Sequence, residues 1–461
     1  MALIKSISGI RGTIGGNPGE NLTPVDVVRF TSAYAEWLKQ RNPNKRCRVA
    51  VGRDARISGE MVNNLVVGSL MGCGVDVVSL GLATTPTVEM AVIHSKADGG
   101  IILTASHNPR HWNALKLLNE KGEFLSDADG REVLKLAESD NLTYATADNL
   151  GLVEEEHSAT DEHISRILKL QYVDVDAIAK ASFTVAIDCV NSVGGIAIPP
   201  LLKALGVKRV VELYTKPTGN FPHNPEPLPE HLGEIAKVVR EHKADVGFVV
   251  DPDVDRLAIV SEDGSMFGEE YTLVACADYV LSRNPGNTVS NLSSTAALRD
   301  ITQKYHKEYS ASAVGEVNVV AKMKEVNAII GGEGNGGVIL PELHYGRDAL
   351  VGIALFLSHL ARSGKKCTEL RASYPSYFIS KNKIELKKGI NPDDILAKLM
   401  DMHRDSRINT IDGLRIDFDS SWVHMRKSNT EPIIRIYAEA QSKEKADELA
   451  KKMMEQIGKM F

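Results

Sequence analysis

Hydrophobic residues along the chain gather into short apolar runs that alternate with longer amphipathic segments. The runs at 47–51, 75–80 and 100–103 have the length and composition of buried strands. Between the first two, residues 58–71 form a segment of helical length. This alternation of strand and helix predicts an α/β fold.

The first predicted helix has a clear start signal. Thr23 can cap its N-terminus, Pro24 suits its first turn, and Asp26 is favourable near the positive end of its dipole. Apolar residues between Val27 and Leu38 supply a side that faces the core. We therefore predict a helix over residues 24–38.

A similar strand–helix–strand unit recurs further along the chain. In both units a glycine, Gly74 or Gly206, ends the helix, and a valine-rich strand follows. A third unit has a predicted helix near 269–283. The later predicted strands are 184–188, 209–213, 246–250, 287–292 and 327–330. The recurrence indicates duplicated α/β domains.

The C-terminal residues follow a different pattern. Three short predicted strands, 414–418, 421–425 and 433–438, are separated by gaps of hairpin length. A predicted helix over 442–457 closes the chain, with apolar residues on one face. Successive strands beside a helix indicate an α+β domain.

Changes in composition suggest where the domains end. Residues 139–149 are polar and lead into the acidic run 154–156, which we interpret as a solvated linker. Five of the 18 prolines fall within 217–229, which excludes regular structure there. We predict four domains, at 1–153, 154–256, 257–370 and 371–461.

The composition is that of a globular protein without a nucleic-acid or membrane signal. Hydrophobic residues make up 43%, charged residues 25%, and the formal net charge of -6 argues against a nucleic-acid partner. No apolar stretch approaches the roughly 18 residues of a membrane span, and we find no signal-peptide core. The five cysteines lack metal-binding spacing, so we expect buried thiols and a cytoplasmic location.

Ser106 lies in the loop 104–109, directly after the apolar run 100–103. A small hydroxyl presented at the end of a strand is a candidate nucleophile or phosphate carrier. Serine, asparagine and proline are also ordinary turn residues, so this segment alone leaves both interpretations open.

Three acidic residues, Asp251, Asp253 and Asp255, alternate directly after the predicted strand 246–250. Their carboxylates repel one another, and a divalent cation removes that conflict; hard oxygen ligands favour Mg²⁺. An EF-hand is excluded because a distal acidic ligand is missing. A polar turn is the alternative, and phosphatases of the HAD class, which also place Asp-x-Asp at a strand end, stay open.

Two further loops are candidates for ligand binding. The glycine-rich loop 331–337 is followed by Val-Ile-Leu-Pro rather than a helix, which argues against a dinucleotide site. It can present Glu333 and Asn335 to a polyhydroxylated ligand, or simply be flexible. The segment 426–432 lies between two predicted strands, and Arg435 follows it. Its cations, hydroxyls and backbone amides suit an anion, although a basic hairpin tip is the alternative.

Basic residues near the N-terminus complete the candidates. Arg11 lies between glycines in a predicted loop, and Lys116 follows Ser106 closely enough to reach back toward it. Arg53 is expected to pair with Asp54 as part of the structure.

Four motifs together resemble those of the α-D-phosphohexomutase superfamily. They are TASHNP, DPDVDR, GEGNGG and RKSNTEP, and they occur in the family's order over essentially the full length. The resemblance implies three related α/β domains with mixed sheets and a smaller C-terminal α+β domain around a central cleft. It also implies one Mg²⁺ per active site.

The resemblance implies that Ser106 carries a phosphoryl group between O6 and O1 of a hexose phosphate, through a sugar 1,6-bisphosphate. It assigns charge stabilisation and proton transfer to Arg11 and Lys116, and positioning of the serine to His107. It also implies that Mg²⁺ is bound by Asp251, Asp253, Asp255 and an oxygen of phosphorylated Ser106. Arg256 would support the loop that binds the metal. It assigns the non-reacting phosphate to Arg426, Ser428, Asn429, Thr430 and Arg435, and the sugar hydroxyls to Glu333 and Asn335.

Departures from the family pattern bear on the sugar. Asn335 and Gly337 stand where many members have serine and histidine, and Asn429 replaces a usual glycine, which the turn tolerates. Glu316 stands where hexose-type members often carry histidine. We hypothesise that Glu316 faces the amino group of a glucosamine phosphate, which predicts a phosphoglucosamine mutase.

Other functions stay open. A phosphomannomutase/phosphoglucomutase is the alternative, and a sugar-phosphate phosphatase with Asp251 as nucleophile is a distant one. A sugar-phosphate binding protein is disfavoured because it would not need all three aspartates. The partner we expect is a small sugar phosphate, with no nucleic acid and no membrane, and the chain is either a monomer or a homodimer.

Overall fold

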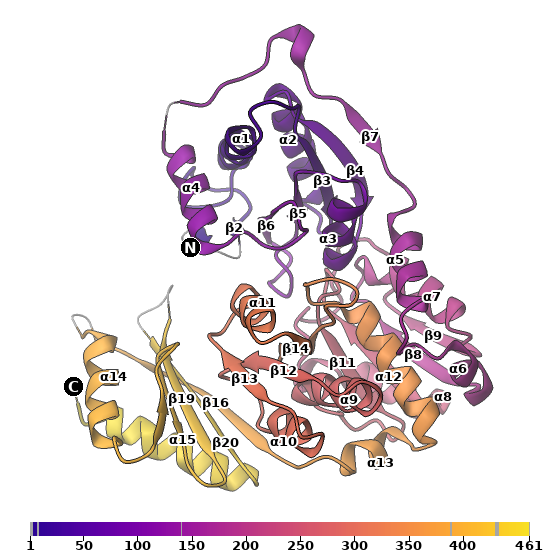
Figure 1. The fold of residues 1–461 in the computed structure, drawn as a ribbon, viewed down its shortest axis with the longest axis vertical. Coiled ribbons are helices and arrows are strands. Elements are labelled where there is room, and N and C mark those ends of the chain that lie inside the picture. The colour runs from indigo at the N-terminus through magenta and orange to yellow at the C-terminus, as the bar shows by residue number, and fades with distance from the viewer. Residues whose placement is uncertain (1–2, 7–8, 140, 388–389, 429–432, 461) are drawn as a thin grey trace. The chain divides into compact units, whose positions relative to one another are not determined.

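The computed structural model describes residues 3–6, 9–139, 141–387, 390–428 and 433–460. The chain forms two compact units, whose elements are labelled in Figure 1. The first unit comprises residues 1–272 and 335–368, and the second comprises residues 273–334 and 369–461. No described helix combines the length and the apolar composition that a membrane crossing requires.

The first unit opens with a mixed seven-stranded sheet in the order β1-β2-β6-β5-β3-β4-β7. Strands β3, β4, β5 and β7 run parallel, whereas β1, β2 and β6 pair antiparallel. Its strands are β1 (Ile4–Ser6), β2 (Gly9–Thr13), β3 (Arg48–Arg53), β4 (Asp76–Leu82), β5 (Gly99–Leu103), β6 (Trp112–Leu118) and β7 (Val153–Glu155). The helices beside it are α1 (Pro24–Arg41), α2 (Gly59–Gly72), α3 (Thr85–His94) and α4 (Asp127–Ala137).

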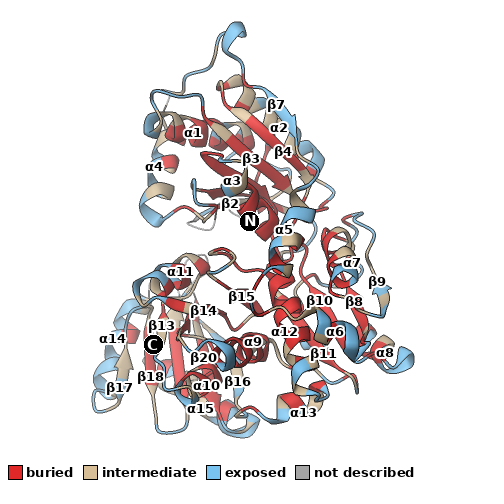
Figure 2. Cartoon of the chain, turned by 45° about the vertical axis from the view of Figure 1, so that its right-hand side comes forward, coloured by how far each residue is buried: buried red, intermediate tan, exposed pale blue. Residues whose placement is uncertain are grey.

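Helices cover both faces of this sheet because apolar residues alternate along its central strands. Val49 and Val51 of β3 pack into the core formed with α1, α2 and α4, whereas Ala50 between them joins a core with α3. Ile101 and Ile102 of β5 divide between the two faces in the same way. Figure 2 shows these strands buried between partly exposed helices.

A second mixed sheet in the first unit has the order β11-β10-β8-β9. Strands β8, β9 and β10 are parallel, and β11 is antiparallel to β10. Its strands are β8 (Thr184–Asp188), β9 (Arg209–Leu213), β10 (Val246–Val250) and β11 (Leu257–Ser261). The helices that follow are α5 (Ala159–Leu168), α6 (Val175–Ala181), α7 (Gly194–Ala204), α8 (Gly233–His242) and α12 (Ala349–Ser363), with β15 (Gly337–Ile339) preceding α12.

The second unit contains parallel strands and an antiparallel sheet. Strands β13 and β14 flank β12 in parallel, and the C-terminal sheet has the order β16-β20-β19-β18-β17. The parallel strands are β12 (Asn287–Asn291), β13 (Tyr309–Ser312) and β14 (Ala328–Glu333), with helices α10 (Ala297–Lys304) and α11 (Glu316–Glu325). The C-terminal elements are β16 (Phe378–Glu385), α14 (Pro392–Met402), β17 (Arg407–Asn409), β18 (Leu414–Asp417), β19 (Trp422–Lys427), β20 (Ile433–Ala440) and α15 (Lys443–Gly458). Helices α9 (Glu269–Arg283) and α13 (Cys367–Ala372) cross from one unit into the other.

The predicted fold class, α/β domains with mixed sheets and a C-terminal α+β domain, is confirmed. The start of α1 is confirmed too, since the Asp26 carboxylate accepts a hydrogen bond from the Thr23 amide at 3.1 Å. All five cysteines are buried thiols that form no disulfide among the described residues, as expected. The acidic run at 154 differs from a simple linker, because Val153–Glu155 pair with β4 as the exposed edge strand β7.

Two strand ends place the chemistry in the first unit. Strand β5 ends at Leu103, just before the loop that carries Ser106, and β10 ends at Val250, directly before Asp251. In parallel α/β sheets, functional loops follow the carboxyl ends of strands in this way.

Candidate active site

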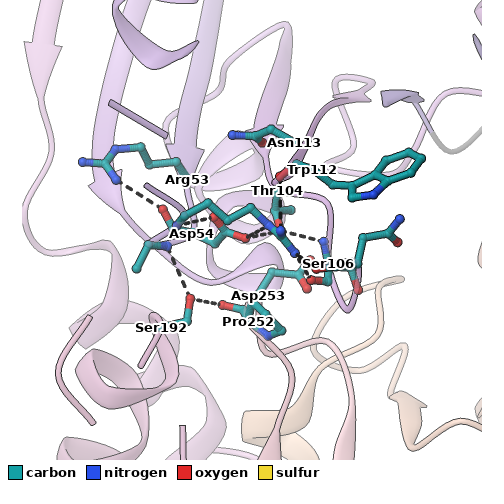
Figure 3. A network of polar contacts seen from close by, with 12 residues as sticks. Arg53, Asp54, Thr104, Ser106, Trp112, Asn113, Ser192, Pro252 and Asp253 are labelled. Atoms are coloured by element: carbon teal, nitrogen blue, oxygen red, sulfur yellow. Dashed lines mark hydrogen bonds and ion pairs between the residues drawn. The ribbon is translucent and has the colours of Figure 1, made fainter. Parts of the chain in front are cut away.

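Ser106 sits on a tight loop after β5 that is held by its own hydrogen bonds. The serine has a left-handed backbone with φ of 49°, which is uncommon for a residue with a side chain. Its amide donates to Thr104 Oγ1 at 2.9 Å, and Thr104 Oγ1 donates to Asp54 Oδ2 at 2.6 Å (Figure 3). The surrounding bonds therefore fix a conformation that the loop would not hold alone.

Arg56 also holds the Ser106 loop in place through hydrogen bonds. Its fully buried guanidinium pairs with the Asp54 carboxylate, with 3.0 Å between Nε and Oδ2. It also donates to four backbone carbonyls of the loop and the strand that follows. These are Asn108 O at 2.7 Å, Pro109 O at 2.8 Å, Trp112 O at 3.1 Å and Ser106 O. A planar group with several donors is suited to collect such acceptors.

The expected pairing of Arg53 with Asp54 is wrong at the side-chain level. Arg53 donates only to the backbone oxygen of Asp54, at 3.2 Å. The Asp54 carboxylate is occupied by Arg56 and Thr104, both of which are buried with it.

The three predicted aspartates meet in the loop between β10 and β11. Asp251, Asp253 and Asp255 are at most 1% exposed, and their ligand atoms lie within 4.8 Å of one another. Val254 between them has φ of 65°, and its amide donates to Asp251 O at 3.1 Å, which tightens the turn. A left-handed β-branched residue is a strained position, as is common in functional loops.

These carboxylates fit a divalent cation. Asp253 Oδ1 and Asp255 Oδ1 are buried and, within the described part of the chain, have no hydrogen-bond partner. Hard, unpaired carboxylate oxygens are the ligands that Mg²⁺ prefers. Ser106 Oγ donates to Asp251 Oδ2 at 2.7 Å, so the serine hydroxyl lies directly beside the candidate metal site.

Cations from distant parts of the first unit offset this buried negative charge. Lys116 Nζ lies 2.8 Å from Asp253 Oδ2 and 3.8 Å from Asp255 Oδ2, and Arg347 Nη2 lies 2.6 Å from Asp255 Oδ2. The Arg256 amide donates to Asp251 Oδ1 at 3.2 Å. Sequence reasoning missed Arg347, as no local spacing connects it to the aspartates.

The aspartates differ in how their surroundings affect ionisation. Burial raises the pKa of Asp251 well above its ordinary value, and repulsion from Asp255 and Asp253 raises it further. Burial also acts to raise the pKa of Asp253, but attraction to Lys116 and hydrogen bonds outweigh it and lower that pKa. Burial opposes the charge on Lys116, yet Asp253 and Asp255 outweigh it and raise the pKa of Lys116.

Ser192 links the segment that carries Asp54 and Arg56 to the aspartate loop. It follows β8, donates to Pro252 O at 2.6 Å and accepts from the Ala55 amide at 3.3 Å (Figure 3). Thr85, at the start of α3, adds a 2.6 Å hydrogen bond to Asp253 Oδ2. Neither residue was predicted, because a single hydroxyl in a loop carries no distinctive signal.

The other predicted residues of the first unit lie near these loops. His107 Nδ1 is 3.3 Å from Ser106 Oγ, and burial followed by the charges of Arg256 and Arg347 holds the pKa of His107 well below its ordinary value. Arg11 lies in strand β2, not in the predicted loop, and is paired with Ala114 of β6. Because Ala114 and Lys116 are two apart, Arg11 and Lys116 share one face of the sheet.

The second unit holds most of the predicted sugar and phosphate residues. Glu333 Oε1 accepts from Asn291 Nδ2 at 2.9 Å and from the Gly315 amide at 3.3 Å, next to Glu316 at the start of α11. Both glutamates are buried. Asn335 belongs to the first unit, where its Oδ1 accepts from the Gly337 amide at 3.2 Å.

Arg426 of β19 lies directly opposite Arg435 of β20. Like charges facing each other across two strands are unfavourable unless an anion or acid lies nearby, and Arg426 Nη1 is 3.4 Å from Asp412 Oδ2. A cavity of about 390 Å³ beside Arg426 is lined by Asp393, Asp412 and Lys427 among others. Ser428 directly follows β19, whereas Asn429 and Thr430 lie outside the described residues.

Comparison with known proteins identifies the family. Four domain families, described as phosphoglucomutase/phosphomannomutase alpha/beta/alpha domains I, II and III and C-terminal domain, match residues 3–143, 161–264, 268–377 and 383–456. A phosphoglucomutase/phosphomannomutase of Thermococcus kodakarensis is 37% identical, covering 95% of this chain and 96% of the relative. A probable phosphoglucosamine mutase of Methanopyrus kandleri is 33% identical, covering 96% of this chain and 95% of the relative. The crystal structure of a family member from Burkholderia thailandensis matches with a TM-score of 0.84 at 26% identity, covering 99% of this chain and 98% of that one.

The grip of Arg56 on the serine loop predicts the effect of a conservative change. In Arg56→Lys the charge opposite Asp54 is kept, but an ammonium cannot reach all the carbonyls that the guanidinium collects. A hydrogen bond to a charged group is worth about 1.5–3 kcal/mol, so we expect amide exchange in residues 104–112 to become about tenfold faster or more. Hydrogen exchange measured by mass spectrometry tests this.

Arg53→Lys is the matched control, because Arg53 donates only to Asp54 O within the described residues. We expect its loop to exchange as in the unaltered protein. Equal exchange in both variants would contradict a specific role of Arg56 in holding the loop.

Proposed function

The chain belongs to the phosphoglucomutase/phosphomannomutase family, and from that premise we propose that it moves a phosphoryl group between O6 and O1 of a hexose phosphate. It is thus a phosphomutase, an isomerase that works by phosphoryl transfer. The observation that carries the proposal is the 2.7 Å contact between Ser106 Oγ and Asp251 Oδ2. A phosphate on this oxygen would lie beside the three carboxylates.

Ser106 is the proposed phosphate carrier. In the first transfer the bond between phosphorus and Ser106 Oγ breaks while a sugar hydroxyl oxygen bonds to phosphorus, giving the sugar 1,6-bisphosphate. In the second transfer Ser106 Oγ takes the other phosphate from that bisphosphate, which leaves the isomeric monophosphate and the starting phosphoserine. Each transfer removes one proton from the attacking hydroxyl and returns one to the leaving oxygen. A sugar 1,6-bisphosphate can therefore also prime an unphosphorylated enzyme.

Asp251, Asp253 and Asp255, together with an oxygen of phosphorylated Ser106, are the proposed holders of one Mg²⁺. When bound, the ion neutralises negative charge on the transferring group. Arg256 supports the loop, since its amide bonds to Asp251 at 3.2 Å. His107, within 3.3 Å of Ser106 Oγ, is assigned the role of orienting the hydroxyl.

Arg11 and Lys116 are the proposed cationic groups for the transfer. We assign charge stabilisation to Arg11, because an arginine cannot release its proton in a protein. We assign proton transfer to Lys116, whose Nζ lies 2.8 Å from Asp253 Oδ2 at the candidate metal site. Their common face on β2 and β6 supports a joint role.

The second unit is proposed to recognise the rest of the substrate. Arg426, Arg435 and Ser428 would hold the phosphate that does not react, and the facing arginine pair supports an anion site. Asn429 and Thr430 stay predictions for the same role. Glu333, Asn335 and Glu316 are assigned to the sugar.

Glucosamine phosphate is the sugar we propose. Glu316 is an acid beside Glu333, and a buried carboxylate suits the ammonium at position 2 of that sugar. Relatives from Methanopyrus kandleri and Sulfurisphaera tokodaii carry names that include phosphoglucosamine mutase. The phosphoglucomutase/phosphomannomutase relative at 37% identity favours glucose or mannose phosphate as the second candidate.

A phosphatase that uses Asp251 as its nucleophile is less well supported. Asp251 is fully buried and accepts a hydrogen bond from Ser106, which leaves the serine oxygen in the better place to attack. We further propose a cytoplasmic enzyme, acting as a monomer or homodimer on a small sugar phosphate. The four domain limits given above likewise remain a proposal.

Replacement of the serine separates mutase from phosphatase. We expect Ser106→Ala to lower the rate of sugar-phosphate isomerisation at least about 1,000-fold, because the phosphate carrier is lost. Phosphate release through Asp251 would be untouched. A coupled assay for the 1-phosphate, run beside an assay for inorganic phosphate, distinguishes the two.

Ser69→Ala is the matched control, since the Ser69 hydroxyl only donates to Leu65 O within helix α2. We expect it to isomerise normally. Unchanged isomerisation in Ser106→Ala would rule out the proposed carrier.

Replacement of Glu316 tests the sugar. We expect Glu316→Gln to lower kcat/KM for glucosamine 6-phosphate about tenfold or more beyond any loss on glucose 6-phosphate, because only the first offers an ammonium. Glu325→Gln, at the exposed end of the same helix, is the control and should change neither value. Equal losses on both sugars would contradict the assignment while leaving the mutase intact.

A further inference from the structure

A second cluster of buried ionisable side chains lies in the first unit, with no part in the chemistry above. Glu89 comes from α3, His163 from α5, and His344 and Asp348 from the segment between β15 and α12. Their exposures are 1%, 1%, 6% and 0%. Buried charged groups are costly unless they are paired or coordinate a metal.

Three potential ligand atoms lie close together. His163 Nε2 is 2.9 Å and His344 Nε2 is 3.3 Å from the same oxygen, Asp348 Oδ2, and the three atoms lie within 4.8 Å of one another. Two ligands bound tetrahedrally to zinc at about 2.0–2.1 Å would be separated by about 3.3 Å. The observed spacing is close to that of a zinc site.

Each of the three side chains makes a further contact through its other nitrogen or oxygen atom, which helps to fix its orientation. His163 Nδ1 is 3.0 Å from Thr87 Oγ1, and His344 Nδ1 is 3.3 Å from Glu89 Oε2. The second oxygen of Asp348, Oδ1, accepts from the amides of Leu350 and Val351 at 2.8 and 3.2 Å. Metal-binding histidines typically donate their other ring nitrogen to an oxygen, as His163 Nδ1 can do to Thr87, whereas His344 and Glu89 lie at ion-pair distance.

Charge balance is compatible with the same occupant. Glu89 and Asp348 bring two negative charges into a site whose four side chains are at most 6% exposed. One divalent cation neutralises both and leaves the two histidines neutral, the form in which they bind metal. Burial opposes the charge on His344, but Asp348 and Glu89 outweigh it and raise the pKa of His344 to about 10, so a protonated cluster is the competing state.

We propose that His163, His344 and Asp348 bind one zinc ion, with Thr87 and Glu89 orienting the two histidines. Three protein ligands leave a fourth position for a water molecule. The ion would fasten α5 to the start of α12, and Thr87 and Glu89 would tie α3 to the same site. This role is structural, and it does not depend on the proposed mutase activity.

Zinc content and thermal stability test the proposal. The full chain without a histidine tag is grown with added zinc, separated from free metal by gel filtration, and analysed by mass spectrometry of the element. We expect about one zinc per chain and a higher Tm after zinc is returned to chelator-treated protein, because an ion that binds only the folded state stabilises it. Cobalt in place of zinc should give the visible absorption of a tetrahedral site.

Variants locate the ion. His344→Gln should lose the zinc, and Thr87→Val should weaken zinc binding about 10–100-fold in competition with a coloured chelator. Asp253→Asn, in the aspartate loop, should keep it. If His344→Gln does not fold, Thr87→Val and the cobalt spectrum of the unaltered chain decide.

Four results would overturn the proposal. These are zinc below about a tenth of an equivalent with no Tm change on reconstitution, cobalt without tetrahedral absorption, zinc that survives in both His344→Gln and Thr87→Val, or zinc that is lost in Asp253→Asn. The first would leave the cluster filled by protons, and the last would place the zinc on the aspartates.

Discussion

Repulsion among three buried carboxylates is the constraint on which the first unit depends. Asp251, Asp253 and Asp255 lie in one tight turn from which water is excluded, where like charges interact far more strongly than in solution. Two cations offset this negative charge. Lys116 comes from strand β6 and Arg347 from the segment between β15 and α12, and each lies within 2.8 Å of an aspartate oxygen. Two carboxylate oxygens still lack a hydrogen-bond partner among the described residues. The electrostatics thus calls for a further cation at the point where Ser106 presents its hydroxyl.

Much of this site could be predicted because its signals are local. Strand β10 has the predicted limits, since an apolar run bounded by acidic residues defines both its ends. Ser106 and the alternating aspartates follow their strands directly, so each was found from a single segment of sequence. Strands β18, β19 and β20 and helix α15 were recovered to within a few residues for the same reason, namely a clear periodicity, whereas β16, β17 and α14 were not predicted.

The parts that were missed depend on pairing between distant segments. Arg347 pairs with Asp255, which lies 92 positions earlier in the sequence, and Arg56 bonds to carbonyls of a loop some fifty positions later. Such sequence separations follow no recognisable motif. Arg11 was expected in a loop because glycines flank it, yet pairing with β6 makes it a strand. The acidic edge strand β7 was hidden likewise, because only its partner β4 gives it a regular backbone. The roles of individual site residues remain predictions.

The contacts of Arg56 have a consequence for how this enzyme can change over time. Its guanidinium reaches the serine loop only through backbone carbonyls, which every amino acid possesses. Substitutions at the loop's side chains therefore leave these acceptors in place, as long as the backbone keeps its course. Asp54 and Arg56 thus hold the backbone of the loop whichever side chains surround Ser106. Substitutions around Ser106 can therefore change substrate preference and turnover while the loop keeps its shape.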